Sequence, residues 1–339
     1  HKRVTRVVTM PAHASPTFAV LGFLTIALQR FGLELSEGVV LQATTVVLAV
    51  TVLFCFTALR ESAGIVGTLL FLALVATTST SSLLSAQPSL SSLMLLFVTF
   101  SPLILLRKDV ADQGRSFLRG YVAAILLGAA AALVQQFLQQ LGHGYWDPVQ
   151  SISTVFLIPG FNSYYDLQYA GGLAGQFKPN GIVFLEPSFL SLYCGFAIVY
   201  LIASFPSKAS PREMLLVGAQ TLLAGAGLVV SSSSSGVLIL ICASFPLLTR
   251  LRRSAALLAG LLIAAITALQ LGILDPLLAK VTEGFDGHTS TALRLTEPYA
   301  VLGSAWLESP LFGSGAGAAY DAVINSGIRG LQATTPIRV

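Results

Sequence analysis

Long apolar runs alternate with short polar stretches over most of the chain. Nine of these runs approach or exceed the roughly 20 residues that a helix needs to cross a bilayer. The run 235–249 is short, and Gln29 and Arg30 interrupt the first run near its end. The runs are 16–33, 39–59, 63–84, 89–106, 116–141, 182–204, 214–230, 235–249 and 254–274. The pattern predicts an all-α, polytopic membrane protein with about nine transmembrane helices, forming a single membrane domain over 1–339.

The composition strengthens this prediction. Hydrophobic residues make up 54% of the chain and charged residues 10%, with a mean hydropathy of +0.79, whereas about a quarter of the residues of a soluble domain are charged. These values exclude an ordinary soluble domain. The sequence starts at His1 rather than Met and ends at Val339 in a polar stretch, so we expect an incomplete chain that continues beyond its C-terminal residue.

The basic residues predict the topology. With the N-terminal tail in the cytoplasm and nine alternating spans, 13 of the 19 Lys and Arg residues fall on the cytoplasmic side, as the positive-inside rule requires. The short outer turns 34–38, 85–88 and 231–234 contain none. The basic clusters are therefore expected to face anionic lipid, and the net charge of +4 does not indicate a nucleic-acid partner.

This topology leaves two large loops on the outer face, 142–181 and 275–339. Trp146 and four tyrosines of the first loop suit a membrane interface, but the same rings can stack on sugars. In the second loop, apolar residues at helical spacing predict an amphipathic helix on the outer leaflet. That face comprises Leu295, Pro298, Tyr299, Leu302 and Trp306. A glycine-rich turn, 312–317, follows, and it lets backbone approach a ligand closely.

The segment 176–190 combines a lysine, a turn and a Glu-Pro pair inside an apolar run. Glu186 is expected about five residues into the sixth span, roughly 7 Å below its start. A carboxylate at that depth needs water or a cation. It therefore belongs either to a functional cavity or to a structural ion pair or cap for groups that Pro187 frees.

Six basic residues lie outside the cytoplasmic clusters, and an outer-face phosphate site must draw on them. They are Arg30, Lys178, Lys280, Arg294, Arg329 and Arg338. Lys178 and Arg294 are either phosphate ligands or interfacial anchors. His288 is either a base or a solvated loop residue. The serines 231–235 either cap helix ends or line a polar cavity. The sequence contains no metal-ligand motif and no P-loop, so no metal or cofactor is expected.

Three motifs in order resemble those of the O-antigen ligase and O-antigen or exopolysaccharide polymerase superfamily of bacterial membrane glycosyltransferases. They are Lys-Pro-Asn-Gly with Glu-Pro-Ser-Phe (178–189), the serine-rich turn (231–236), and Ser-x-x-x-Arg leading to Leu-Phe-Gly-Ser-Gly-Ala-Gly (290–317). The resemblance covers roughly 115–320. It implies a GT-C-like fold in the bacterial inner membrane and metal-independent, inverting transfer of a glycan from a polyprenyl-diphosphate carrier at the periplasmic face.

The resemblance assigns candidate roles. The expected catalytic residues are Arg294, Glu186 and Lys178, and the expected substrate-binding residues are Asn180, Ser188, His288, Gly313 and Gly315. Arg294 matches the family's arginine in the second loop, and Lys178 stands where members commonly have arginine. The implied partners are the polyprenyl-diphosphate-linked glycan, membrane lipids, and a flippase and chain-length regulator of the same pathway. We expect Lys178, Glu186 and Arg294 to converge on one outward-facing cavity.

Alternative functions remain. Ligases carry a His-Asn pair after the glycine-rich turn, and the sequence has none before Val339, which favours a polymerase over an O-antigen ligase. The serine-rich turn also lacks the arginine that members often have there. A secondary transporter or flippase would use Glu186 as an ion site, but transporters place such residues near the bilayer midplane. A non-catalytic membrane subunit is the third alternative.

Overall fold

A computed structural model describes part of the chain. The described residues are 15–36, 39–56, 72–80, 97, 111–158, 176–205, 210–233, 235–240, 242–243, 299, 302–303 and 307. Helices make up most of them. The principal helices are α1 (Pro16–Ala27), α2 (Ala43–Phe56), α6 (Ala111–Gln140), α8 (Pro187–Ala203) and α9 (Pro211–Val230).

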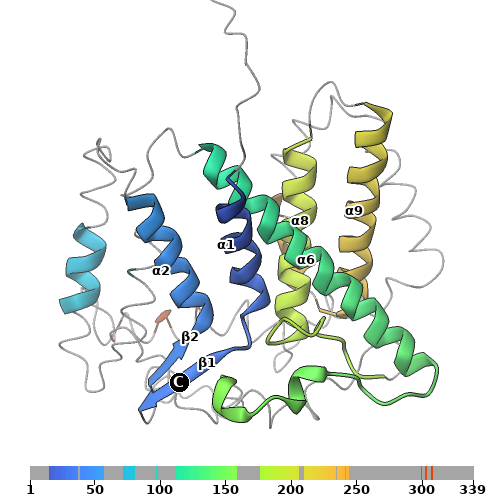
Figure 1. The fold of residues 1–339 in the computed structure, drawn as a ribbon, viewed down its shortest axis with the longest axis horizontal. Helices are drawn as coiled ribbons and strands as arrows, with labels where there is room; N and C mark the ends of the chain where they lie inside the picture. Colours follow the sequence, from blue (N-terminus) through green and yellow to red (C-terminus); the bar gives the residue numbers. More distant parts are fainter. Residues whose placement is uncertain are drawn as a thin grey trace, which may run out of the picture.

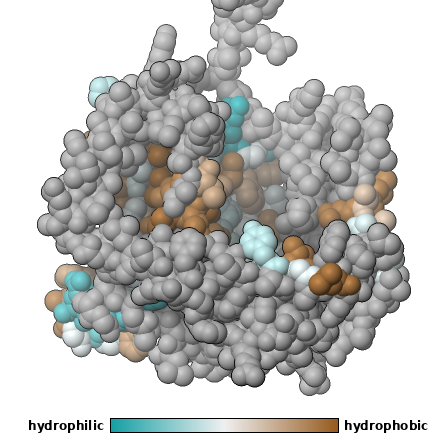
Figure 2. Space-filling view, turned by 180° about the vertical axis from the view of Figure 1, so that it is seen from behind, coloured by the Kyte–Doolittle hydropathy of each residue, from teal (hydrophilic) through white to brown (hydrophobic). Residues whose placement is uncertain are grey.

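Among the described residues, two helices are long and apolar enough to cross a membrane, namely Gln113–Gln140 within α6 and Pro211–Val230, whereas α1, α2 and α8 are shorter apolar helices. Among the coloured residues in Figure 2, hydrophobic ones line the hollow in the middle of this face, and hydrophilic ones lie at a lower corner and above the hollow. The predicted helical character is thus confirmed for the described residues, and two of their helices are suited to cross a membrane by length and composition. The number of nine spans and the GT-C-like fold stay predictions, because 57–71, 81–96, 98–110 and 244–298 lie outside the described residues.

The helices run in alternating directions, so chain segments far apart in sequence meet at one end of the bundle (Figure 1). The last residues of α1, α6 and α9 lie at this end, together with the first residues of α2 and α8. We call it the loop end. The 3-10 helices η2 (Pro148–Ser151) and η3 (Thr154–Phe156) also lie there.

Small residues bring α1 and α6 into close contact. A Cβ atom on Gly22 would clash with the backbone carbonyl of Phe117, and one on Gly120 with the backbone carbonyl of Ala19. Such close packing through small residues is typical of membrane helices, because apolar lipid gives no hydrophobic force that drives helices together. On the other side of α6, Gly227 of α9 lies against Ala129. The buried core between α6, α8 and α9 is therefore compact.

A short hairpin between α1 and α2 was not predicted. Strands β1 (Gly32–Ser36) and β2 (Val39–Gln42) pair antiparallel, with Leu33 opposite Leu41. The predicted spans 16–33 and 39–59 were therefore wrong at the ends that face each other, since α1 stops at Ala27 and α2 starts at Ala43. The physical reason is that residues 32–36 alternate apolar and polar, which is the period of a strand.

The other helix limits agree with the sequence to different degrees. The predicted spans 116–141 and 214–230 correspond closely to α6 and α9. The predicted start at 182 was wrong, because α8 begins at Pro187. In the second predicted loop, Tyr299, Leu302, Gly303 and Leu307 are helical and the rest lies outside the described residues.

Candidate functional site

The non-helical segment 176–186 crosses the loop end of α6 and leads into α8 (Figure 1). Three side chains of α6, which we call the glutamine clamp, hold it: Gln135, Gln136 and Gln139. The backbone N–H of Gly181 donates to Oε1 of Gln135 at 2.9 Å. Gln139 bonds both backbone groups of Phe177, accepting from N at 2.9 Å and donating to O at 3.1 Å. The clamp thereby satisfies backbone groups that a helix would otherwise have paired.

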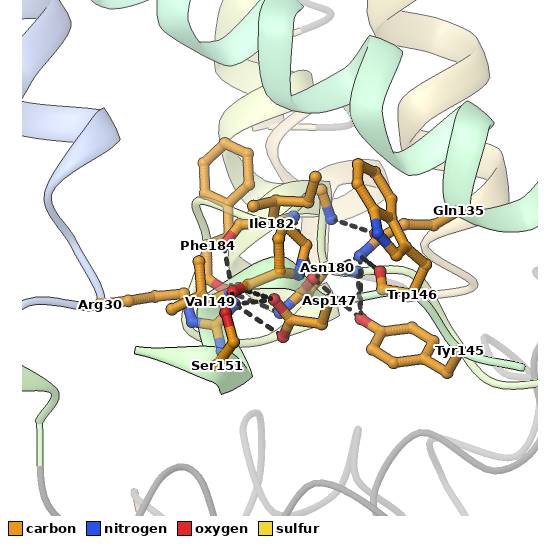
Figure 3. Close-up of polar contacts among 12 residues, drawn as sticks. Arg30, Gln135, Tyr145, Trp146, Asp147, Val149, Ser151, Asn180, Ile182 and Phe184 are labelled. Carbon is orange, nitrogen blue, oxygen red and sulfur yellow. Dashed lines mark hydrogen bonds and ion pairs between the residues drawn. The ribbon is translucent and has the colours of Figure 1, made fainter. Parts of the chain in front are cut away.

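Within this segment, the chain from Lys178 to Glu186 forms a turn. Asn180 lies in this turn and is fully buried (Figure 3). Its Oδ1 accepts from the hydroxyl of Tyr145 at 2.8 Å and from the backbone N–H of Ile182 at 3.0 Å. Gln135 donates to the same oxygen at 3.2 Å, and Nδ2 of Asn180 donates to the carbonyl of Phe184 at 3.2 Å. Asn180 therefore holds the turn in this structure, and the substrate contact expected from the sequence stays a prediction.

The turn contains two successive residues with left-handed backbone. Gly181 and Ile182 both have φ of +67°. Gly181 packs so closely on α6 that a Cβ atom would clash with the backbone carbonyl of Gly128. Ile182 is β-branched, and a non-glycine residue held in this region costs on the order of 1–3 kcal/mol. Strain of this kind persists only where neighbouring contacts fix the backbone.

A buried ion pair supplies one of these contacts. Nη1 of Arg30 lies 2.9 and 2.8 Å from the two carboxylate oxygens of Asp147, and it donates to the carbonyl of Ile182 at 2.8 Å. The side chains of Arg30 and Asp147 are 2% and 0% exposed. Oδ1 of Asp147 also accepts from the backbone N–H of Val149, at the start of η2. This contact joins the segment after α1, the first loop and the turn (Figure 3).

The ion pair bears on the prediction that Arg30 is a candidate phosphate ligand. Arg30 was one of six candidates for a phosphate site, but its guanidinium is buried against Asp147, so it is not placed to meet a ligand from outside. Asp147 was missed. A signal existed, because an arginine at the end of an apolar run needs an opposite charge. The sequence offered several loop acids and no means of choosing among them.

Glu186 and Lys178 lie at the two ends of the turn, and both are half-buried. Glu186 is the N-cap residue of α8, not a residue inside a helix, so its predicted depth was wrong. Pro187 occupies the first helical position, where its missing N–H removes no hydrogen bond. Oε2 of Glu186 accepts from the hydroxyl of Ser188 at 2.8 Å, and its side chain makes no capping bond to α8. The carboxylate therefore serves neither as the expected helix-interior charge nor as a cap.

The serine-rich turn after α9 is tied to α8. The hydroxyl of Ser191 donates to the carbonyl of Ser233 at 2.8 Å and accepts from the backbone N–H of Gly236 at 3.0 Å. Ser231 donates to the carbonyl of Leu228 at 2.6 Å. The Ser231 contact is that of a helix end and favours the capping alternative for this serine. The Ser191 contacts join α8 to the turn.

The remaining candidates lie outside the described residues: Arg294, His288, Gly313 and Gly315. The predicted convergence of Arg294 with Lys178 and Glu186 therefore stays a prediction. Within the described part of the chain, no three His, Cys, Asp or Glu side chains come together as a metal site would require. No protein-family model, curated protein or solved structure matches the sequence or the fold.

The clamp gives the first testable prediction. In Gln135→Leu, the N–H of Gly181 and the carbonyl of Trp146, which Gln135 contacts at 2.9 Å each, lose their partner in a buried site. We expect a loss of about 1–3 kcal/mol in unfolding free energy, measured by denaturant titration of the detergent-solubilised protein. Gln140→Leu, on an exposed position of the same helix, is the control and should differ little from wild type. Equal stability of both variants would contradict this assignment of the clamp.

Proposed function

We propose that this protein is a membrane glycosyltransferase that polymerises polyprenyl-diphosphate-linked glycan repeat units at the outer face of the bacterial inner membrane. One observation carries the proposal. A lysine and a carboxylate are held half-buried on a single fixed, non-helical segment at the loop end of an apolar helical bundle. The sequence around them, 178–189, is the first of the three motifs on which the resemblance to this family depends.

The proposed chemistry follows from these side chains. The ammonium of Lys178, joined by the guanidinium of Arg294 from the second loop, would bind the donor diphosphate and neutralise the charge that develops as it leaves. The carboxylate of Glu186 would take the proton of the acceptor hydroxyl. The acceptor oxygen attacks the anomeric carbon from the face opposite the diphosphate. The bond from that carbon to the diphosphate oxygen breaks, and the configuration inverts. Polyprenyl diphosphate leaves with the bonding electrons, and the proton remains on Glu186.

A fixed backbone suits this reaction. Catalysis by charge stabilisation requires charged groups whose positions are set before the transition state forms. The turn that joins Lys178 to Glu186 is held by buried hydrogen bonds from Gln135 and Asn180. Nothing in this arrangement requires the turn to rearrange when substrate arrives.

The proposal predicts the phenotype of three variants. In a strain that lacks the wild-type gene, the wild-type chain should restore long-chain polysaccharide, whereas Lys178→Ala, Glu186→Gln and Arg294→Ala should not. Loss of a general base lowers turnover by about 100-fold to 10,000-fold, which is enough to abolish long chains on gels of the extracted glycan. Lys178→Arg, which keeps the cation, should retain part of the activity.

The control and the alternatives have separate outcomes. Glu34→Gln removes an exposed carboxylate from β1 and should restore wild-type chains. Normal chain length in all three test variants would contradict the proposed catalytic residues. Normal chains that fail to reach the lipid core would identify a ligase instead. Accumulation of lipid-linked units on the cytoplasmic leaflet in the deletion strain would identify a flippase.

A further inference from the structure

We propose that the buried pair Arg30–Asp147 is a positioning device for the site, because it fixes the strained turn at Ile182 that joins Lys178 to Glu186. The inference rests on the proposed function for what the site does, but the contacts that it invokes do not depend on that function. It assigns a role to a residue that would otherwise count only as a candidate phosphate ligand, and to an aspartate that no sequence motif singled out.

One nitrogen atom of Arg30 makes both contacts, with Asp147 and with Ile182. Nη1 of Arg30 contacts both carboxylate oxygens of Asp147 and also donates to the carbonyl of Ile182, all within 2.8–2.9 Å. Hydrogen bonds from an ionised donor are shorter and roughly twice as strong as neutral ones. The negative charge of Asp147 keeps the guanidinium in place, and the guanidinium in turn fixes the direction of the Ile182 carbonyl.

The position of Ile182 makes this contact relevant to the site. It lies four residues after Lys178 and four residues before Glu186. Its φ of +67° is a backbone conformation that a β-branched residue rarely adopts. Its N–H is held by Asn180 and its carbonyl by Arg30. Rotation of this residue toward ordinary backbone angles would change the direction of the chain on both sides, and so the separation of Lys178 and Glu186.

Stability alone is a weak reason for the pair. Replacement of a buried ion pair by uncharged residues of similar volume is often neutral or stabilising, because desolvation offsets the attraction of the charges. Strained backbone that neighbouring groups hold in place is concentrated at functional sites. A charged pair that reaches the strained carbonyl therefore suits positioning better than it suits packing.

The test removes both charges together. Arg30→Met combined with Asp147→Asn leaves no unpaired buried charge and keeps an oxygen that can accept from Val149 N–H. Hydrogen exchange would be followed by mass spectrometry on the protein in lipid nanodiscs, and the affinity for farnesyl diphosphate would be measured in the same preparation. Arg119→Met combined with Glu34→Gln removes the same charges from exposed positions and is the matched control.

We expect the amides of 181–183, all hydrogen-bonded in the structure, to exchange at least ten-fold faster in the double variant, because local opening becomes easier. Exchange in α8 and α9 should stay unchanged. The Kd for farnesyl diphosphate should rise at least five-fold. The control should match wild type in every measurement. Should the double variant not fold, Arg30→Lys serves instead, since it keeps a cation beside Asp147 while losing the guanidinium, and the same amides should show a smaller acceleration.

Two results would overturn the inference. One is unchanged exchange at 181–183 in a folded variant. The other is equally faster exchange throughout α1, α6 and α8, which a merely structural role would produce. Failure of the proposed function would look different: the amides of 181–183 would respond as expected, while Lys178→Ala and Glu186→Gln would leave polysaccharide chains of normal length.

Discussion

Alanine in place of Asp147 is expected to lower the unfolding free energy by about 3–5 kcal/mol, because it leaves the guanidinium of Arg30 buried without its opposite charge. The arginine side chain is 2% exposed, so water cannot replace the lost carboxylate without a change in the loop end. The N–H of Val149, which donates to Oδ1 of Asp147, loses its partner as well. A loss of this size is a large fraction of the roughly 5–15 kcal/mol by which native proteins are stable.

Denaturant titration and thermal aggregation of the purified protein would measure this effect. Glu34→Ala is the control, since it removes a carboxylate from an exposed strand position and should change stability by no more than about 0.5 kcal/mol. If Asp147→Ala unfolds at the same denaturant concentration as wild type, water solvates the guanidinium of Arg30, and the pair is not buried as the structure shows.

Two identical substitutions on α6 are expected to act in opposite directions. Gly120→Ala places a methyl group against the backbone carbonyl of Ala19, which cannot move unless α1 shifts as a whole. Overpacking of this kind costs about 1–3 kcal/mol, and more where backbone must move. Gly114→Ala meets nothing within 4 Å. It should stabilise the protein by about 0.5–1 kcal/mol, because alanine is the better helix former.

Parallel denaturant titrations of the two variants would check this prediction. Cysteine pairs introduced on α1 and α6 would report the separation of the helices by spin-label distances, with a longer distance expected in Gly120→Ala alone. Stabilisation by both substitutions would mean that α1 does not pack against Gly120 of α6, and the interface between the two helices would be wrong.

The helices that the sequence predicts well are those with their own end signals. The start of α9 follows from the Ser-Pro-Arg-Glu segment, where Ser210 and Glu213 form a capping box in the structure. The body of α6 follows from an apolar run that contains no proline. In both cases the local sequence determines the helix, so it can be recognised without tertiary information.

The start of α8 and the hairpin were missed because tertiary contacts decide them. Residues 182–185 are as apolar as a helix interior. They are nevertheless non-helical, since their backbone groups are met by side chains such as Asn180 rather than by a preceding turn of helix. Hydropathy predicts that such a stretch is buried, but it carries no information on the backbone conformation of the stretch.

The candidate site was predicted in part for a similar reason. Lys178 and Glu186 stood out because charges are rare in apolar runs. Gln135 lies in the last part of α6 with no charge or motif beside it, and Arg30 and Asp147 are separated by 117 positions. A sequence shows that a buried polar group must have a partner, but only the fold shows which partner it has.

The late start of α8 has a consequence for the surrounding lipid. A helix of 17 residues spans about 26 Å at 1.5 Å per residue, which is less than the roughly 30 Å of a typical hydrocarbon core. In the proposed membrane setting, the bilayer would thin beside the site to match this short helix. The headgroup level would then descend toward Glu186, so that a lipid-linked donor could reach the carboxylate laterally, with its chain still in the leaflet.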